Sequence, residues 1–568
     1  MSRFYNHLLI FGINYFYILI SLIVLFFAIK ANIDLSNQRY ELHMDERLTF
    51  DGVKNILNSK DLSAFSYNLI DGGDHRYGRV LWNFGALFSF LPELVYGVKG
   101  QIVFTRFMLI FFVFSTYFIV LFGVLESKIS RLIFSLVYFF IPFTSYYLTM
   151  PKPEPIQVFF IALFVFVVKK TNRFFGLHWL PLGIAFGCKI NLIPIGLIMM
   201  FLLFYRFRKD FIEGKKIIYI SINSFLLGIM FAEPYLASVI TSIIVILSLF
   251  YFILINTKKV KSIIYYSGLF LVFLFILFMF NFHLIKNWLN FTLYNTSHGT
   301  DSNNINFFSW IKYIISIYFD NSIVFIAIFL FLIVTSVVFY IKKSSSLFSQ
   351  KIKLSYLILF FGFILILTIV LFVKRLWGIY LYPGTVLLLI GYCVFQENFP
   401  LTSKFKSNFI KKSILSMNIF IVCLSLFYWS NISINELINS SKRTESNEYK
   451  VSKLSYTFCK NYLDSIANVK KEKLKIISYP GFFPLQSNND YQVEEYFGPF
   501  LNWKSKADFI IFYRKFRFTN KDVDFNNKLK EKQLFKKYVL EKCLVKNIHY
   551  EVVKSFVNDM VLLRLVEK

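Results

Sequence analysis

Apolar runs about as long as a lipid bilayer is thick recur along the first three quarters of this chain. A helix that spans the hydrocarbon core needs about 20 mostly apolar residues. Such runs lie at approximately 7–29, 100–124, 131–149, 155–168, 217–235, 237–256, 263–281, 321–341, 354–373, 376–395 and 412–430. The chain is 56% hydrophobic and only 17% charged, against about 45–50% and 25% in soluble domains. The sequence therefore predicts an α-helical polytopic membrane protein.

The basic residues indicate how the chain crosses the membrane. The net charge is +29, but Lys and Arg gather in short clusters between apolar runs, which is the positive-inside pattern and not a nucleic-acid surface. Placing the N-terminus in the cytoplasm requires the stretch 175–204 to cross twice, with its turn near Lys189. The cytoplasmic side then holds 22 Lys and Arg and the short outer loops hold five. We predict about 13 transmembrane helices with the C-terminus outside.

This orientation divides the chain into a membrane domain, 1–430, and an outer soluble domain, 431–568. The membrane domain has a long first outer loop at about 30–98, whose aromatic stretch 81–96 is compatible with the interface, and a further outer loop at about 282–319. The tail has the composition of a small α/β or α+β domain. A helix is expected at 445–465, strands at 475–479 and 507–512, and a hairpin within 552–566. Cys459 and Cys543 are its two cysteines, and both a disulfide and free thiols stay open.

The first candidate site lies in the first outer loop. Asp45 and Glu46 follow the first span by some 15 residues, and adjacent carboxylates at a membrane surface suit a general base or a metal ligand. His75 and Arg76 lie in the same loop. The alternative interpretation is a solvated acidic turn, but the position of the pair beside the membrane favours a site.

Two further segments carry charge at the outer ends of apolar runs. The turn at 150–155, Met-Pro-Lys-Pro-Glu-Pro, is made rigid by three prolines and presents Lys152 and Glu154 at the bilayer edge. Lys189 lies between two short membrane helices, where an ionisable residue is costly and usually has a role or a partner. Each segment also has a structural interpretation, as a helix-breaking turn and as a lysine that reaches the surface.

A fourth segment opens the last outer turn, with Lys374 and Arg375 followed by Tyr380 and Tyr382. Two cations beside aromatic side chains suit a phosphate at the membrane surface. An interfacial anchor of aromatic and cationic residues is the equally ordinary alternative. All four segments fall on one side of the predicted membrane, which indicates a site at the outer leaflet for an anionic lipid and a polar acceptor.

The order and sidedness of these segments resemble the GT-C glycosyltransferases, which use polyprenyl-phosphate-linked sugars. The resemblance covers roughly 1–430 and is nearest to protein O-mannosyltransferases and the aminoarabinose transferase of lipid A. It includes Asp45-Glu46, the Lys-Pro-Glu turn at 152–154, the Gly-x-x-x-Gly-x-Lys-x-Asn segment at 183–191 and the Arg-x-x-x-x-Tyr-x-Tyr-Pro stretch at 375–383. The tail lacks the Trp-Trp-Asp-type signature of oligosaccharyltransferases, which argues against that branch.

The resemblance implies a role for each candidate residue. Asp45 would be the catalytic base and Glu46 would hold the acceptor or orient Asp45. The donor phosphate would meet a set of cations (Lys189, Lys374 and Arg375). A second set would line the cavity or contact the acceptor (Lys152, Glu154, His75, Arg76, His298, Tyr380 and Tyr382). The implied partners are a polyprenyl-phosphate sugar, a lipid, glycan or protein acceptor, and membrane lipids, in a bacterial inner membrane.

Other functional classes stay open at this point. A surface polysaccharide polymerase or ligase also uses polyprenyl-linked sugars and would rely on outer-loop Arg and His, for which His298 is available. A lipid-linked sugar transporter or flippase would favour inverted repeats, which the sequence does not display. No second acidic pair suggests a metal, so no cofactor is assigned and metal-independent chemistry is favoured over a divalent ion.

Overall fold

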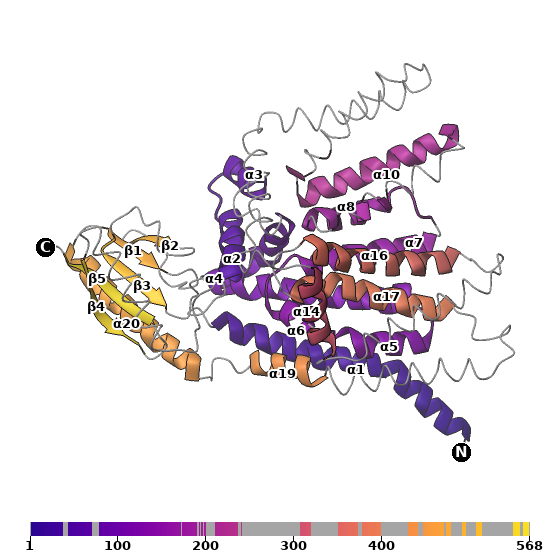
Figure 1. Cartoon of the computed structure of the whole chain (residues 1–568), viewed down its shortest axis with the longest axis horizontal. Helices are drawn as coiled ribbons and strands as arrows, with labels where there is room; N and C mark the ends of the chain where they lie inside the picture. Colours follow the sequence, from indigo (N-terminus) through magenta and orange to yellow (C-terminus); the bar gives the residue numbers. More distant parts are fainter. Residues whose placement is uncertain are drawn as a thin grey trace. The chain divides into compact units, whose positions relative to one another are not determined.

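The computed structural model describes residues 2–37, 44–70, 79–141, 143–171, 173–189, 192, 195–196, 198–199, 211–233, 235–236, 240, 307–319, 350–372, 378–398, 430–440, 447–470, 473–478, 491–495, 507–513, 549–556 and 560–566. These residues form mostly helices and one small sheet (Figure 1). The chain divides into two compact units. The first comprises Met1–Asn32 with Thr49–Asn439, and the second Ile33–Leu48 with Ser440–Lys568.

Four segments of the described residues are long and apolar enough to cross a membrane. They are Tyr15–Ser36, Arg79–Val124, Leu354–Leu371 and Gly378–Glu397. These lie in α1 (Ser2–Asn37), α4 (Arg79–Phe118) with the π-helical η2 (Ile119–Val124), α16 (Gln350–Phe372), and the 3-10 helix η4 (Gly378–Leu381) with α17 (Tyr382–Asn398). The predicted helical architecture with apolar spans is confirmed at this level. Four spans are fewer than the 13 predicted. The runs 263–281 and 321–341 lie outside the described residues, and so do the runs 237–256 and 412–430 except for residues 240 and 430.

The apolar run at 131–149 is not one continuous helix. It forms α5 (Lys128–Tyr138) and α6 (Thr144–Thr149), and Phe143 between them has a φ of 76°. Pro142 precedes this break and has no backbone N–H to donate to a helix. The sequence interpretation did not foresee this break in the helix, although one proline is enough to divide an apolar run.

Two glycines bring α8 (Trp179–Cys188) against α10 (Phe211–Ala232) at backbone distance. A Cβ atom added to Gly183 would lie 2.1 Å from the carbonyl oxygen of Phe225, and one added to Gly228 would lie 2.3 Å from that of Leu180. Small residues four apart allow membrane helices to approach in this way. The Gly-x-x-x-Gly pattern at 183–187 is therefore explained by the packing of α8 on α10. This packing also fixes the C-terminal end of α8, which Lys189 follows.

Substitution of Gly228 by Ala should destabilise the first unit. The added methyl group meets the backbone of Leu180 and cannot be accommodated by a side-chain rotation, so α8 and α10 must separate. Overpacking of this kind costs about 1–3 kcal/mol. Thermal unfolding in detergent should show a lower Tm for Gly228→Ala. Leu227→Ala, at the half-exposed neighbouring position, is the control and should unfold near the native temperature.

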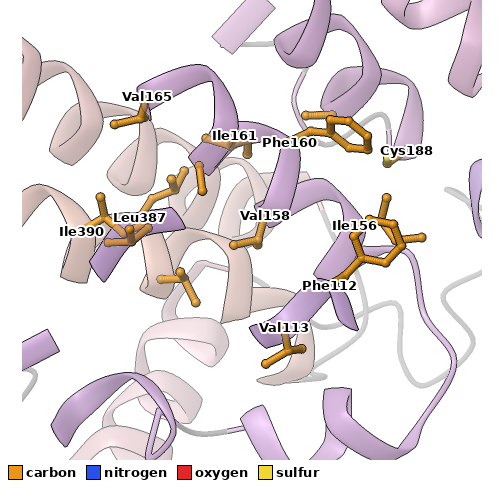
Figure 2. Close-up of a cluster of buried hydrophobic side chains, with 14 of the residues drawn as sticks. Phe112, Val113, Ile156, Val158, Phe160, Ile161, Val165, Cys188, Leu387 and Ile390 are labelled. Atoms are coloured by element: carbon orange, nitrogen blue, oxygen red, sulfur yellow. The ribbon is translucent and has the colours of Figure 1, made fainter. Parts of the chain in front are cut away.

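Helix α7 (Glu154–Thr171) lies at the centre of the first unit. Figure 2 shows Ile156, Phe160 and Val165 of this helix among buried side chains that include Phe112 of α4 and Leu387 of α17. Figure 1 shows α7, α8, α16 and α17 running in a similar direction, and contacts connect α7 with α8 and α17 and connect α16 with α17. This packing fixes both ends of α7 in relation to its neighbours.

Charged side chains around Glu397 join the C-terminal end of α7 to α17. Lys169, in the last turn of α7, lies 3.3 Å from the Glu397 carboxylate and 3.1 Å from that of Glu126. Glu397 also accepts hydrogen bonds from the backbone N–H groups of Glu126 (2.5 Å) and Ser127 (2.6 Å), immediately before α5 begins. A side chain of α17 thus satisfies backbone donors at the start of a helix 270 residues earlier in the chain.

The long outer loops of the sequence interpretation contain helices. The region 30–98 forms α2 (Met44–Leu57), α3 (Leu62–Ile70) and the first part of α4, and the region 282–319 ends in α14 (Phe307–Phe319). The early residues of the tail form α19 (Ser430–Ser440), and the first unit extends to Asn439. Figure 1 shows α14 running across the direction of α16, with which it is in contact.

The second unit contains a five-stranded sheet in the order β2-β1-β3-β5-β4. The strands are β1 (Leu474–Ser478), β2 (Tyr491–Glu495), β3 (Phe509–Tyr513), β4 (His549–Ser555) and β5 (Met560–Val566). Strand β1 pairs in parallel with β2 and β3, while β5 is antiparallel to β3 and β4. The preceding helix α20 (Asn447–Lys470) contributes Cys459 and Leu463 to a core with Ile476 and Phe509. The predicted helix, two strands and terminal hairpin are confirmed, whereas β2 was missed.

Cys459 is a buried free thiol in this core, and Cys543 lies outside the described residues. Burial raises the pKa of the Cys459 thiol from 9.0 to about 12, and the nearby Lys554 opposes this only in part. Since the thiolate is the nucleophile, its population at pH 8 falls by roughly 1,000-fold. Mass spectrometry should show no alkylation of native Cys459 at pH 8 and full alkylation after unfolding without reductant. Failure to react after unfolding would reveal a disulfide instead.

Candidate functional site

Three of the four charged segments singled out in the sequence meet at one place in the first unit. The ammonium group of Lys189 forms an ion pair with Oε1 of Glu154. The same Nζ atom lies 4.5 Å from the centre of the Tyr380 ring, in cation–π geometry. The three residues come from the end of α8, the start of α7 and η4. We refer to Glu154, Lys189 and Tyr380 as the polar cluster.

Glu154 is the most enclosed member of the polar cluster. It is the first residue of α7 and only 1% exposed, at a helix N-terminus whose partial positive charge favours a carboxylate. The turn at 151–153 directly precedes Glu154 and leads the chain into α7. Its second oxygen, Oε2, has no hydrogen-bond partner among the described residues. A buried acceptor without a donor is costly, so this atom suits a donor group that arrives with a ligand.

Lys189 directly follows the end of α8 and is not part of the helix. α8 ends at Cys188, and Lys189 is extended, with φ −162° and ψ 131°. Gln157 of α7 fixes this exit, because its Nε2 donates to the carbonyl oxygens of Ala185 (3.2 Å) and Lys189 (3.4 Å). The Lys189 side chain is 25% exposed. Its charge therefore has a buried counter-ion on one side and an open approach on another.

Tyrosine side chains support the polar cluster from α6 and α17. The hydroxyl of Tyr147 donates to the carbonyl oxygen of Ile379 at 2.7 Å, immediately before Tyr380. The Tyr147 ring lies 4.5 Å from that of Tyr382, and both side chains are fully buried. Tyr382 thus has no exposed surface to offer a ligand in this structure and acts in packing, while the partly buried Tyr380 faces the lysine.

Lys152 and Arg106 bring further positive charge to the same end of α6 and α7. Lys152 is 3% exposed, in the segment that joins the two helices. Arg106 of α4 is 1% exposed, donates to the carbonyl oxygen of Thr149 and lies 5.6 Å from the Phe50 ring. The interpretation of the sequence did not include Arg106. Its position within the apolar run 100–124 was the available signal, because ionisable residues in such runs are rare and usually functional.

Glu233 is a second buried acidic residue that the sequence interpretation missed. It is 3% exposed and follows α10 directly. A Cβ atom on Gly187 would lie 3.3 Å from the Glu233 backbone nitrogen, so the residue sits beside the C-terminal end of α8. The signal was a glutamate followed by a proline beside an apolar segment, as at 154–155.

The predicted catalytic pair lies at the start of α2. Asp45 is the second residue of this helix, and Glu46 is 7% exposed. Helix α2 continues into the first unit, where Gln101 Nε2 donates to the Phe50 carbonyl oxygen at 2.7 Å. The carboxylate of Asp45 and five other predicted site residues (His75, Arg76, His298, Lys374 and Arg375) lie outside the described part of the chain.

The part of the chain that the structure describes contains no group of three His, Cys, Asp or Glu side chains arranged to hold a metal ion. The fold and the site define the chain as a mostly helical protein with membrane-length apolar helices, a buried charged cluster between three of its segments, and a small mixed sheet. No family model matches the chain, and no curated protein matches it in sequence.

Proposed function

We propose that the chain is an inverting membrane glycosyltransferase of GT-C type that moves a sugar from a polyprenyl-phosphate donor to a lipid, glycan or protein acceptor. The observation that supports this best is the polar cluster. A buried carboxylate, a partly exposed lysine and an aromatic ring, predicted from three segments far apart in sequence, are in direct contact. Membrane proteins retain such groups mainly where a polar or charged ligand is handled.

The polar cluster suits an anionic leaving group. Glu154 orients the Lys189 ammonium group, and the exposed side of this group can donate a hydrogen bond to a phosphate oxygen. Glu154 Oε2 can accept a hydrogen bond from a sugar hydroxyl. Lys374 and Arg375, just before η4, are proposed to share the phosphate, and Lys152 is proposed to line the same cavity with Glu154.

The proposed reaction is a single displacement at the anomeric carbon. Asp45 removes the proton from the acceptor hydroxyl or amine as its oxygen or nitrogen bonds to that carbon. The bond to the donor phosphate oxygen breaks on the opposite face, and its electron pair leaves with the polyprenyl phosphate. The cations stabilise this developing charge. One glycosidic bond forms as one breaks, no redox step occurs, and the configuration inverts.

The proposal includes the topology read from charge. The chain crosses a bacterial inner membrane about 13 times, with the N-terminus in the cytoplasm and the C-terminal domain outside. This topology puts Asp45, the turn at 150–155, Lys189 and the stretch 374–383 all on the outer side of the membrane. The donor would arrive there from the bilayer, and the acceptor from the bilayer or from the aqueous phase.

The test is sugar transfer by the purified full chain in liposomes. Radiolabelled polyprenyl-phosphate sugars, including hexoses, pentoses and amino sugars, are supplied with lipid, glycan and peptide acceptors. We expect one donor class to be consumed, with release of polyprenyl phosphate and a product whose anomeric configuration is inverted. Lengthening chains would indicate the polysaccharide polymerase. Movement of intact donor between leaflets without transfer would indicate the flippase.

A further inference from the structure

Helix α4 contains a hairpin that the apolar pattern does not reveal. Its two halves, 79–96 and 98–118, join at Gly97, where φ is 60° and ψ is −150°. Glycine adopts positive φ without steric cost, which permits the reversal. Ser89 contacts residues of the second half, donating to the Gln101 carbonyl oxygen at 3.1 Å and lying 2.9 Å from Thr105 Oγ1.

Aromatic contacts extend the pairing of the two halves along their length. The rings of Phe88 and Phe111 are 5.2 Å apart, and those of Phe84 and Phe112 are 5.0 Å apart. The two halves run in opposite directions. Partners of residues later in the first half lie earlier in the second half: Phe84 contacts Phe112, whereas Ser89 bonds to Gln101 and Thr105. The segment 79–96 is therefore an arm that folds back along a helix of membrane-spanning length.

The outer side of this arm is apolar and exposed. Seven residues around the hairpin turn have exposed fractions from 42% to 72% (Leu87, Phe90, Leu91, Leu94, Val95, Tyr96 and Val98). We call these residues the hairpin face. The acidic residue of the arm, Glu93, is half-buried and interacts electrostatically with Lys54 of α2. The arm therefore directs its polar contacts toward the protein.

The hairpin face continues the exposed apolar surface of a spanning segment. Phe111, Phe118 and Phe122 are 39–49% exposed along the second half of α4 and in η2. Phe231 of α10, also exposed, contacts Phe84 of the arm at 6.2 Å between ring centres. Contiguous apolar surface of this kind is unfavourable in water and marks contact with a membrane or another protein. Its continuity with membrane-length helices favours lipid.

We propose that the hairpin face contacts the acyl chains of the bilayer, so that residues 79–96 form a membrane-embedded arm. The arm is then part of the lipid-facing wall of the first unit and not of a water-exposed loop. The Ser89 hydroxyl finds its hydrogen-bond partners on the second half of the hairpin, as a polar group in a low-dielectric surrounding requires. This inference does not depend on sugar transfer.

Nitroxide accessibility in the full chain tests the proposal. Cys423 and Cys543 are replaced by Ser, since Cys188, Cys393 and Cys459 are buried and should stay unlabelled in the native protein. Single cysteines then replace Leu91 or Leu94, and the spin-labelled protein is reconstituted in phosphatidylcholine–phosphatidylglycerol vesicles. Collision rates are measured with oxygen, which concentrates in lipid, and with a water-soluble nickel chelate. Leu371, exposed on α16, serves as the lipid-facing reference, and Leu454, exposed on α20, as the aqueous one.

We expect the ratio of oxygen to nickel collisions at Leu91 and Leu94 to match that at Leu371 and to exceed that at Leu454. A ratio at both arm positions equal to that at Leu454 would overturn the proposal, because the hairpin face would then lie in water. Low accessibility to both reagents would also overturn it, since a protein partner or a second copy would cover the face. Circular dichroism and size exclusion confirm that each labelled variant is folded.

Discussion

Asp45→Asn should lower sugar transfer by at least about 100-fold, the lower range for loss of general acid–base catalysis. The amide keeps the size and much of the hydrogen bonding of the carboxylate but cannot accept the acceptor's proton. Binding of the polyprenyl-phosphate sugar should survive, because the proposed base does not contact the donor phosphate. Transfer and donor binding are measured on the same liposome preparation, so the two effects separate.

The neighbouring carboxylates provide matched controls for this result. Glu46→Gln should have a smaller effect that depends on the acceptor, because Glu46 is proposed to hold the acceptor or orient the base. Asp51→Asn removes a carboxylate from the same helix and should leave transfer within a few-fold of the native rate. Near-normal transfer by Asp45→Asn, with native transfer established, would remove Asp45 as the base and direct the search to Glu46 and Glu233.

Removal of the cation from the polar cluster should produce the largest loss of stability. Lys189→Met leaves the Glu154 carboxylate, which is 1% exposed, without its counter-ion. Breaking a buried pair in this way costs about 3–5 kcal/mol. Glu154→Gln should cost less, because the Lys189 side chain is 25% exposed and its ammonium can reach solvent. Thermal unfolding of both variants in the same detergent gives the comparison.

The double variant separates packing from chemistry. Lys189→Met with Glu154→Gln has no buried charge at the polar cluster, so most of the stability lost by Lys189→Met should return. Sugar transfer and donor affinity should not return, because the cation proposed to meet the phosphate is still missing. Lys170→Met, at an exposed position in the last turn of α7, should change neither property. Recovery of transfer by the double variant would assign the pair a structural role only.

The parts of the fold that the sequence predicted are those set by local pattern. Apolar runs identified α1, α7, α10, α16 and α17, and the tail's buried strands identified β1 and β3. The strand β2 was missed because its sequence, Tyr-Gln-Val-Glu-Glu, lacks the apolar run of a buried strand. The reversal of the chain after 79–96 was not predicted, because it depends on the φ angle of Gly97, which hydrophobicity does not report.

The site shows the same division. Lys152, Glu154, Lys189 and Tyr380 were recognisable as polar residues at the ends of apolar segments. The contact of Lys189 with Glu154 and Tyr380 was not, because it depends on where α8 ends and on the Gln157 hydrogen bonds that hold that end to α7. Tyr382 was predicted beside Tyr380 at the site, yet helix geometry turns it into the core, where it packs on Tyr147. Sequence adjacency therefore did not predict a shared surface.

Charged contacts at both ends of α7 couple this helix to α17. Lys169 ties the last turn of α7 to Glu397 near the end of α17, while Lys189 bridges Glu154 in the first turn of α7 and Tyr380 just before α17. Sliding or rotation of one helix against the other would break charged contacts at both ends at once. We therefore expect α7 and α17 to move together as one rigid unit.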